Sequence, residues 1–337
     1  MRRLALAAFA APALLAQQSA LDPAGPDAGA IRALLVFFVV LLGALFLLVV
    51  AMTIIPLVRR HRGIDQEPLE RTHRPSANTE LRLKAVTGVA TVATIVILFG
   101  LVVLSVSVGK ATSSALDRTN SMVVEVTGNQ WWWHVQYAND DASRIAVTAN
   151  EMHIPVGRSV MIRATSNDVI HSFWAPNLQG KRDLFPKHIT TEWFQADRPG
   201  RFRGQCAEFC GLQHAHMALW VVAEPPAKFE SWLAHQLEPS AAPSGDDQKH
   251  GQEVFLNNAC AMCHTIAGTG AAGQVGPDLT HFGSRLTLAA GTLPNSKGNL
   301  AGWIADPQSV KPGNHMATVP IKPEDMQPLI DYLESLR

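Results

Sequence analysis

Charged residues are scarce in this 337-residue sequence, and cysteines are scarcer. Asp, Glu, Lys and Arg make up 17% of the chain and hydrophobic residues 47%, a balance too apolar for an ordinary soluble protein, so membrane segments are expected. The formal net charge is zero. The chain therefore lacks the basic field that nucleic-acid binding needs, and nucleic acid is excluded as a partner.

The four cysteines form two close pairs, Cys206 with Cys210 and Cys260 with Cys263. A small secreted domain held together by disulfides would contain cysteine at much higher density. The spacings within the two pairs are instead typical of metal and haem attachment. The cysteines therefore point to redox cofactors.

The N-terminus has the pattern of a secretory signal. Two arginines after Met1 precede a short apolar run that ends near Ala16, and this run is too short to cross a membrane. We expect residues 1–20 to form a signal peptide.

Two longer apolar stretches, residues 33–55 and 85–108, contain no charged residue. At about 1.5 Å per residue each can cross a hydrocarbon core of roughly 30 Å. They predict a transmembrane hairpin over residues 31–110, with helices at about 33–57 and 85–108. Seven Lys or Arg residues lie between the two helices, in residues 59–84, and the positive-inside rule makes this loop cytoplasmic. The chain after the second helix is then on the periplasmic, outer side.

The remaining sequence predicts two soluble domains. Residues 120–223 contain short β-type runs separated by turn residues, typical of an antiparallel sandwich or barrel. An amphipathic helix is expected to complete this domain, which we place at 111–237. A Pro- and Ser-containing linker follows at 238–247. Residues 248–337 have helical patterns, and so small a unit needs a staple that a haem would supply.

The β-rich domain contains soft metal ligands close together. Cys206, Cys210, His214 and Met217 lie within twelve residues, and His171 begins a His-Ser sequence upstream. Thiolate, thioether and imidazole groups together select copper over hard cations. This set exceeds what one blue-copper ion uses and suits two copper ions bridged by the thiolates.

The pattern C-x-E-x-C-x3-H-x2-M resembles the binuclear CuA loop of cytochrome c oxidase subunit II, in which a cupredoxin-like Greek-key domain follows two transmembrane helices. The resemblance implies these copper ligands: Cys206, Cys210, His171, His214, Met217 and the Glu208 carbonyl. It also implies that the Glu208 carboxylate binds a magnesium ion shared with subunit I. His216 lies next to Met217 and remains an alternative to His214, which the family spacing favours.

Three consecutive tryptophans, Trp131, Trp132 and Trp133, cannot all point inward in an alternating strand. At least one indole must face outward. From the pattern alone it could equally pack at the membrane interface. The family resemblance implies instead that electrons enter the copper domain through this aromatic cluster, and that Trp131 is the residue through which they enter. Other histidines of the domain are expected to be surface or structural residues: His134, His153 and His188.

Cys260, Cys263 and His264 form the C-x-x-C-H sequence to which a c-type haem is attached. A zinc site built from the same three residues lacks an obvious fourth ligand. Residues 248–337 resemble class I cytochrome c. This resemblance implies that His264 is the proximal iron ligand, that its ring is oriented by the Pro277 carbonyl, and that the distal ligand is Met316. Other side chains left open for the distal position are Met262, Met326 and His315.

Taken together, these features resemble subunit II of a caa3-type haem-copper oxidase with a fused cytochrome c domain. We therefore expect a multidomain membrane protein with a two-helix transmembrane hairpin, an all-β cupredoxin-like Greek-key domain and an all-α class I cytochrome c domain. Its expected place is the bacterial inner membrane, with both soluble domains outside. Electrons from a cytochrome c or a bc1-type donor would pass through haem c and the copper pair.

The expected partners are subunits I and III of the oxidase, and the oxygen-reduction site is expected in subunit I rather than in this chain. One departure from the family lies at the start of the second helix, where Glu80 is displaced and Arg82 stands where an acid is usual. The alternative function is a membrane-anchored copper-delivery or thiol-redox protein. That class would have one anchor and a βαβ pattern, and would leave His214 and Met217 unexplained.

Overall fold

A computed structural model describes residues 18–61, 76–115, 119–141 and 144–337. The predicted signal peptide lies almost entirely outside these residues, as does most of the basic loop between the predicted transmembrane helices. The chain divides into two compact units: residues 30–115 form one, and residues 1–29 with 116–337 form the other.

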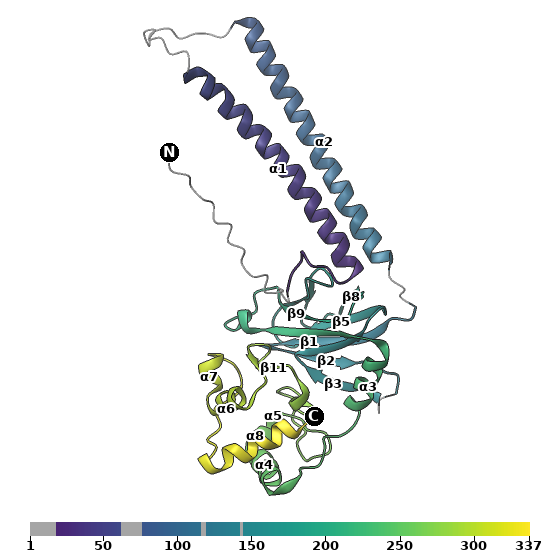
Figure 1. The fold of residues 1–337 in the computed structure, drawn as a ribbon, viewed down its shortest axis with the longest axis vertical. Coiled ribbons are helices and arrows are strands. Elements are labelled where there is room, and N and C mark those ends of the chain that lie inside the picture. Colours follow the sequence, from purple (N-terminus) through teal and green to yellow (C-terminus); the bar gives the residue numbers. More distant parts are fainter. Residues whose placement is uncertain (1–17, 62–75, 116–118, 142–143) are drawn as a thin grey trace, which may run out of the picture. The chain divides into compact units, whose positions relative to one another are not determined.

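Two long apolar helices, α1 (Pro26–His61) and α2 (Ala77–Ala115), dominate the first unit and run side by side (Figure 1). Both are long and apolar enough to cross a membrane. Several of their hydroxyl groups bond to carbonyls one turn earlier, as in Thr53 to Val49 at 2.8 Å and Ser107 to Val103 at 2.8 Å. A helix whose polar groups are satisfied internally suits an apolar surrounding. Both helices extend beyond the predicted spans.

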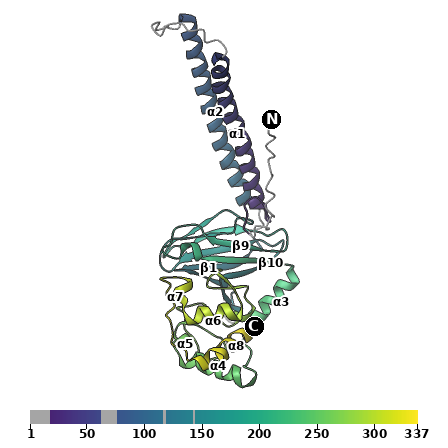
Figure 2. The ribbon, with the colours of Figure 1, turned by 60° about the vertical axis from the view of Figure 1, so that its left-hand side comes forward.

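The β-rich domain is built from two five-stranded sheets (Figure 2). The first has the order β3-β2-β1-β5-β8, and its strands in chain order are β1 Met122–Asn129, β2 Trp132–Tyr137, β3 Ala146–Ala149, β5 Val160–Ser166 and β8 Thr190–Phe194. The second has the order β4-β10-β9-β6-β7, with β4 Glu151–Pro155, β6 His171–Trp174, β7 Arg182–Leu184, β9 Gly200–Cys206 and β10 Ala218–Glu224.

The sheets are mixed rather than purely antiparallel, because β1 pairs with β5 and β10 pairs with β4 in parallel. A parallel pair needs a crossover, and the chain between β1 and β5 supplies one by passing through β4 of the other sheet. Strand β1 alternates buried and half-buried residues, as expected for a strand with one face on a core. The core includes the fully buried rings of Trp133, Phe173 and Phe194.

Helix α3 (Pro226–Gln236) closes one end of this domain and buries Phe229. Its Trp232 ring stacks on His153 with 4.1 Å between centroids. The imidazole of His153 lies between two carboxylates, 2.9 Å from Glu151 and 3.1 Å from Glu224. His153 is therefore a buried structural residue.

The C-terminal domain is mainly helical, with a small two-stranded sheet. Its elements are α4 Gly245–Asn257, α5 Cys260–Cys263, β11 Thr287–Leu288, β12 Leu293–Pro294, α6 Lys297–Ala305, α7 Pro307–Val310 and α8 Pro323–Ser335. Phe255 of α4 packs against Tyr332 of α8. Helix α4 begins at Gly245, inside the segment expected as a linker, because Asp246 and Asp247 in its first turn favour a helix N-terminus.

Candidate copper and haem sites

The predicted copper ligands come from two neighbouring strands and the loop after them. His171 begins β6, Cys206 ends β9, and Cys210 lies in the loop before β10. All three are buried, and their ligand atoms lie within 4.8 Å of one another. His171 and Cys206, which are 35 positions apart in the sequence, are thus brought together by the pairing of β6 with β9.

The other predicted ligands surround this point. His214 Nδ1 lies 3.5 Å from the Cys210 sulfur, and Met217 Sδ lies 3.8 Å from it. The Glu208 carbonyl is 3.2 Å from Cys206 Sγ. His216, the alternative to His214, instead places its Nδ1 2.8 Å from the Gln213 side chain. The geometry therefore favours His214 as the second imidazole.

The two thiols, Cys206 and Cys210, shift each other's pKa in opposite directions. A hydrogen bond with Cys210 lowers the pKa of Cys206 to about 4, and the same interaction, with burial, raises the pKa of Cys210. One thiolate is therefore available to a metal at neutral pH before any metal binds. Thiolates, imidazoles and a thioether in one buried cluster fit copper, which supplies one-electron transfer when bound.

Sequence reasoning missed two residues that support His171. Asp168 lies 2.7 Å from His171 Nε2, so the other ring nitrogen, Nδ1, faces Cys206 at 3.8 Å. Burial lowers the pKa of His171, but hydrogen bonds with Asp168 and Cys206 outweigh it and raise the pKa. Gly128 lies against the same ring, where an added Cβ would come within 2.7 Å of it. The position of Asp168, three residues before a predicted ligand, was the one available sequence signal.

The three tryptophans have different surroundings. Trp133 is fully buried, Trp132 is half-buried beside His134, and Trp131 is only 6% exposed. Trp132 is therefore the most outward of the three. Trp131 Nε1 donates to the carbonyl of Cys210 at 3.0 Å, and its ring lies 5.6 Å from the ring of His315 in the C-terminal domain. Trp131 thus connects the copper loop to the haem domain.

The C-x-x-C-H sequence forms helix α5 and the residue after it. His264 Nδ1 lies 2.7 Å from the Pro277 carbonyl, which leaves Nε2 as the free ring nitrogen. Burial lowers the pKa of His264, so the ring is neutral at physiological pH, as an iron ligand must be. Gly276 lies so close that an added Cβ would be 2.6 Å from the ring. These residues fit a covalently attached haem.

Met316 lies on a loop fixed by amide side chains. Its N–H donates to Asn314 Oδ1 at 2.7 Å, and its carbonyl accepts from Gln308 Nε2 at 3.0 Å. Of the two other methionines considered, Met262 is 75% exposed between the attachment cysteines, and Met326 packs against the core of the C-terminal domain. The surroundings therefore favour Met316 as the distal side chain.

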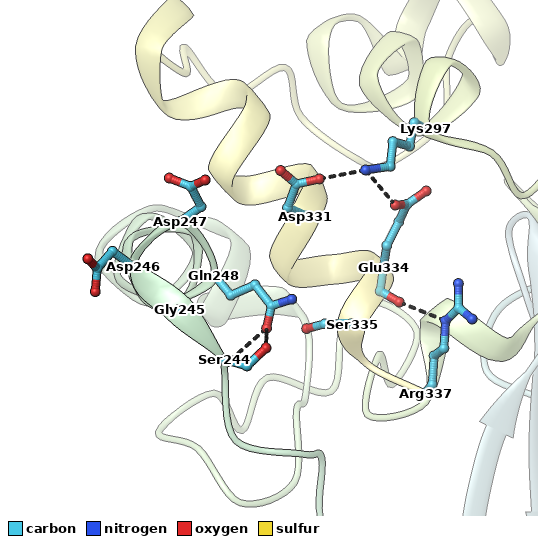
Figure 3. Close-up of a pocket in the computed structure, with 10 residues that line it drawn as sticks. All are labelled: Ser244, Gly245, Asp246, Asp247, Gln248, Lys297, Asp331, Glu334, Ser335 and Arg337. Atoms are coloured by element: carbon cyan, nitrogen blue, oxygen red, sulfur yellow. Dashed lines mark hydrogen bonds and ion pairs between the residues drawn. The ribbon is translucent and has the colours of Figure 1, made fainter.

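A polar hollow elsewhere in this domain is lined by residues that form ion pairs with one another (Figure 3). Lys297 of α6 reaches Asp331 at 2.7 Å and Glu334 at 3.3 Å on α8. Its lining is charged and contains neither haem-attachment cysteine. The ion pairs of this hollow therefore join α6 to α8, and the hollow is separate from the cofactor sites.

Both soluble domains match known protein families. The family model for the periplasmic domain of cytochrome c oxidase subunit II matches residues 139–224, and that for cytochrome c matches residues 248–337. Cytochrome c oxidase subunit 2 of Alkalihalophilus pseudofirmus is 35% identical over 329 residues, which cover 95% of this chain and 91% of the relative. The same subunit of a Bacillus species is 32% identical over a region that covers 68% of this chain and 66% of the relative.

Among solved structures, the periplasmic domain of subunit II of cytochrome oxidase from Bradyrhizobium japonicum is 29% identical. The matched region covers 34% of this chain and 92% of the chain in that structure, with a TM-score of 0.32.

A periplasmic domain of the oxidase subunit II type and a cytochrome c domain follow a pair of apolar helices in the sequence. Together they define a membrane-anchored electron-transfer protein with its soluble part on the outer side of the membrane. The chain belongs to the cytochrome c oxidase subunit II family, in the caa3-type form with a fused cytochrome c domain. It is a subunit of a haem-copper terminal oxidase, the one through which electrons enter, and its cofactors are haem c and the copper of the CuA centre. The expected family, fold and function are thus confirmed.

Proposed function

We propose that electrons pass from the haem on Cys260 and Cys263 to a copper pair held by Cys206 and Cys210, and that Trp131 is the residue between them. The observation that carries this proposal is the double contact of Trp131. Its indole N–H bonds to the carbonyl of Cys210 at 3.0 Å, and its ring lies 5.6 Å from that of His315. His315 immediately precedes Met316, the proposed distal ligand.

The surroundings of the copper site suit a one-electron relay. His171 is oriented by Asp168 before any metal binds, and Cys206 and Met217 are buried in the core of the domain. Ligands fixed by neighbouring side chains move little when a metal changes charge. A site of this kind favours electron transfer over bond chemistry.

The copper pair passes its electrons to subunit I, where oxygen reduction is coupled to proton pumping, and subunit III completes the core. The carboxylate of Glu208 is the candidate ligand for a magnesium ion shared with subunit I. This carboxylate is half-exposed, so a cation can reach it once it displaces Lys181, whose ammonium group lies 3.8 Å away. A cytochrome c or a bc1-type complex reduces haem c. The subunit lies in the bacterial inner membrane after export with its signal peptide.

The proposal is tested in the whole oxidase by replacing Trp131. An electron is injected into haem c with a photoreductant, and the absorbances of haem c and of the copper centre are followed in time. Trp131→Gln is expected to slow the transfer roughly a hundredfold, because the path loses its ring contact. Trp132→Gln, at the outward-facing neighbour, is the matched control. An unchanged rate in Trp131→Gln with an intact copper spectrum would show that Trp131 is not on the path.

A further inference from the structure

Lys311 is a buried lysine in a part of the protein where two domains meet. It is only 3% exposed, although lysine is almost never fully buried without a charged partner. Its ammonium group donates to two carbonyl oxygens, those of Trp131 at 2.9 Å and Ala289 at 3.3 Å. Burial lowers the pKa of Lys311 to about 7. A long apolar side chain would fill the same space without the cost of removing an amine from water.

The acceptors show what Lys311 joins. Ala289 belongs to the haem domain, whereas Trp131 belongs to the copper domain. The indole of Trp131 is already held by the Cys210 carbonyl. Trp131 is therefore fixed from both sides, by its side chain to the copper loop and by its backbone to the haem domain.

The loop from Lys311 to Met316 is braced internally, so anchoring Lys311 also anchors the rest of the loop. Asn314 Nδ2 donates to the Lys311 carbonyl at 2.7 Å, and Asn314 Oδ1 accepts from the N–H of Met316 at 2.7 Å. Gln308 Nε2 bonds to the carbonyls of Asn314 and Met316, each at 3.0 Å. His315 lies between these anchored residues.

A second contact holds the same loop to the copper domain. Gln213, which lies three residues after Cys210, donates to the Pro312 carbonyl at 2.7 Å. Leu212 lies against Gly313, where an added Cβ would come within 2.8 Å of it. One short loop of the haem domain therefore reaches both Trp131 and the copper loop.

We propose that Lys311 is a positioning residue for electron transfer between the domains, and that its bond to the Trp131 carbonyl keeps the ring of His315 against the ring of Trp131. This inference rests on the proposed path through Trp131. The haem domain then delivers electrons from a docked position and not by chance encounters at the end of its linker. Pre-positioning of this kind removes the entropic cost of finding the productive geometry.

The test measures the rate of electron transfer from haem c to the copper centre in the whole oxidase. Lys311→Met keeps the length of the side chain but removes the donor, and it is expected to slow the transfer roughly tenfold. Lys311→Gln retains a donor and is expected to recover part of the rate. Lys322→Met, at an exposed lysine of the same domain, is the matched control. Haem absorbance and the copper EPR signal report that both centres are intact.

Each result has one reading. A slowed Lys311→Met with intact centres and partial recovery in Lys311→Gln supports the inference. A Lys311→Met rate equal to that of Lys322→Met overturns it, as does a slowing that Lys311→Gln does not relieve at all. If Lys311→Met loses a cofactor, Lys311→Gln is compared with the wild type instead. A slower transfer in Lys311→Gln with both centres intact supports the inference, and a wild-type rate overturns it. A normal rate in Trp131→Gln would overturn the path itself, which is a separate outcome.

Discussion

The imidazole of His171 donates from Nε2 to the carboxylate of Asp168 across 2.7 Å. This bond keeps a proton on Nε2, because an ionised carboxylate only accepts hydrogen bonds. A nitrogen that carries a proton cannot bind a metal. The other ring nitrogen, Nδ1, then faces Cys206 and is the one left to bind the metal. Carboxylates that orient metal-binding histidines in this way raise the basicity of the ring and hold it in place. The copper site is therefore prepared by a residue outside its ligand set.

Removing that carboxylate should weaken copper binding while leaving the ligands in the chain. Asp168→Ala is expected to lower copper affinity by about 10- to 100-fold, because His171 loses both its orientation and its preferred tautomer. A titration against a copper chelator, with EPR as the readout, measures the change. Asp140→Ala, at an exposed aspartate of the same domain, serves as control. Equal affinities in the two variants would contradict the role assigned to Asp168.

Two glycines make room for the two histidines. An added Cβ at Gly128 would come within 2.7 Å of the His171 ring, and one at Gly276 within 2.6 Å of the His264 ring. Real Cβ atoms essentially never approach this closely, so either the ring or the backbone at the glycine must shift. Gly128→Ala is expected to reduce bound copper with haem content unchanged, and Gly276→Ala to reduce covalent haem with copper content unchanged. Metal analysis and haem staining of the purified subunit measure both quantities.

Gly270→Ala provides the matched control for this pair, since nothing lies within 4 Å of its added Cβ. It should retain both cofactors. If Gly128→Ala and Gly276→Ala each lost both cofactors, the defect would be a general failure to fold, and the separate roles of the two glycines would be disproved.

The distal position on the haem can be tested by comparing two methionines. Met316→Leu removes the thioether from a loop held by Asn314 and Gln308, and it should abolish the sulfur-to-iron charge-transfer band and lower the haem potential, because a Met/His pair raises it. Met262→Leu, at an exposed site, should change neither property. A band that persists in Met316→Leu would assign the distal ligand to another residue.

Much of this architecture could be predicted because its signals are local in the sequence. The C-x-x-C-H sequence, the C-x3-C loop and the two uncharged stretches each lie within a few tens of residues. Asp168 and Gly128 could not be predicted in the same way, since their importance depends on how β6 packs against the neighbouring chain. Lys311 was missed for a similar reason. A lysine in a Lys-Pro-Gly sequence indicates an exposed turn, and only the contact between two domains buries it.

The burial of Lys311 should also make stability depend on pH. Its pKa is about 7 in the folded protein and about 10.4 in an unfolded chain, so between these values the unfolded state binds more protons. Stability therefore rises with pH across this window and is lowest, as far as Lys311 is concerned, below pH 7. The gain from pH 7 to 9.5 is on the order of 3 kcal/mol at most, because separation of the domains can expose the amine without unfolding.

Lys311→Met has no group to titrate, so the difference in unfolding free energy between it and the wild type should shrink or reverse as the pH rises through this range. Denaturant unfolding of the two proteins at about pH 6.5, 8 and 9.5 measures this difference. Lys322→Met, which removes an exposed amine, should differ from the wild type by the same amount at all three pH values. A Lys311→Met difference that is equally constant would mean that the amine of Lys311 is not desolvated where the two domains meet.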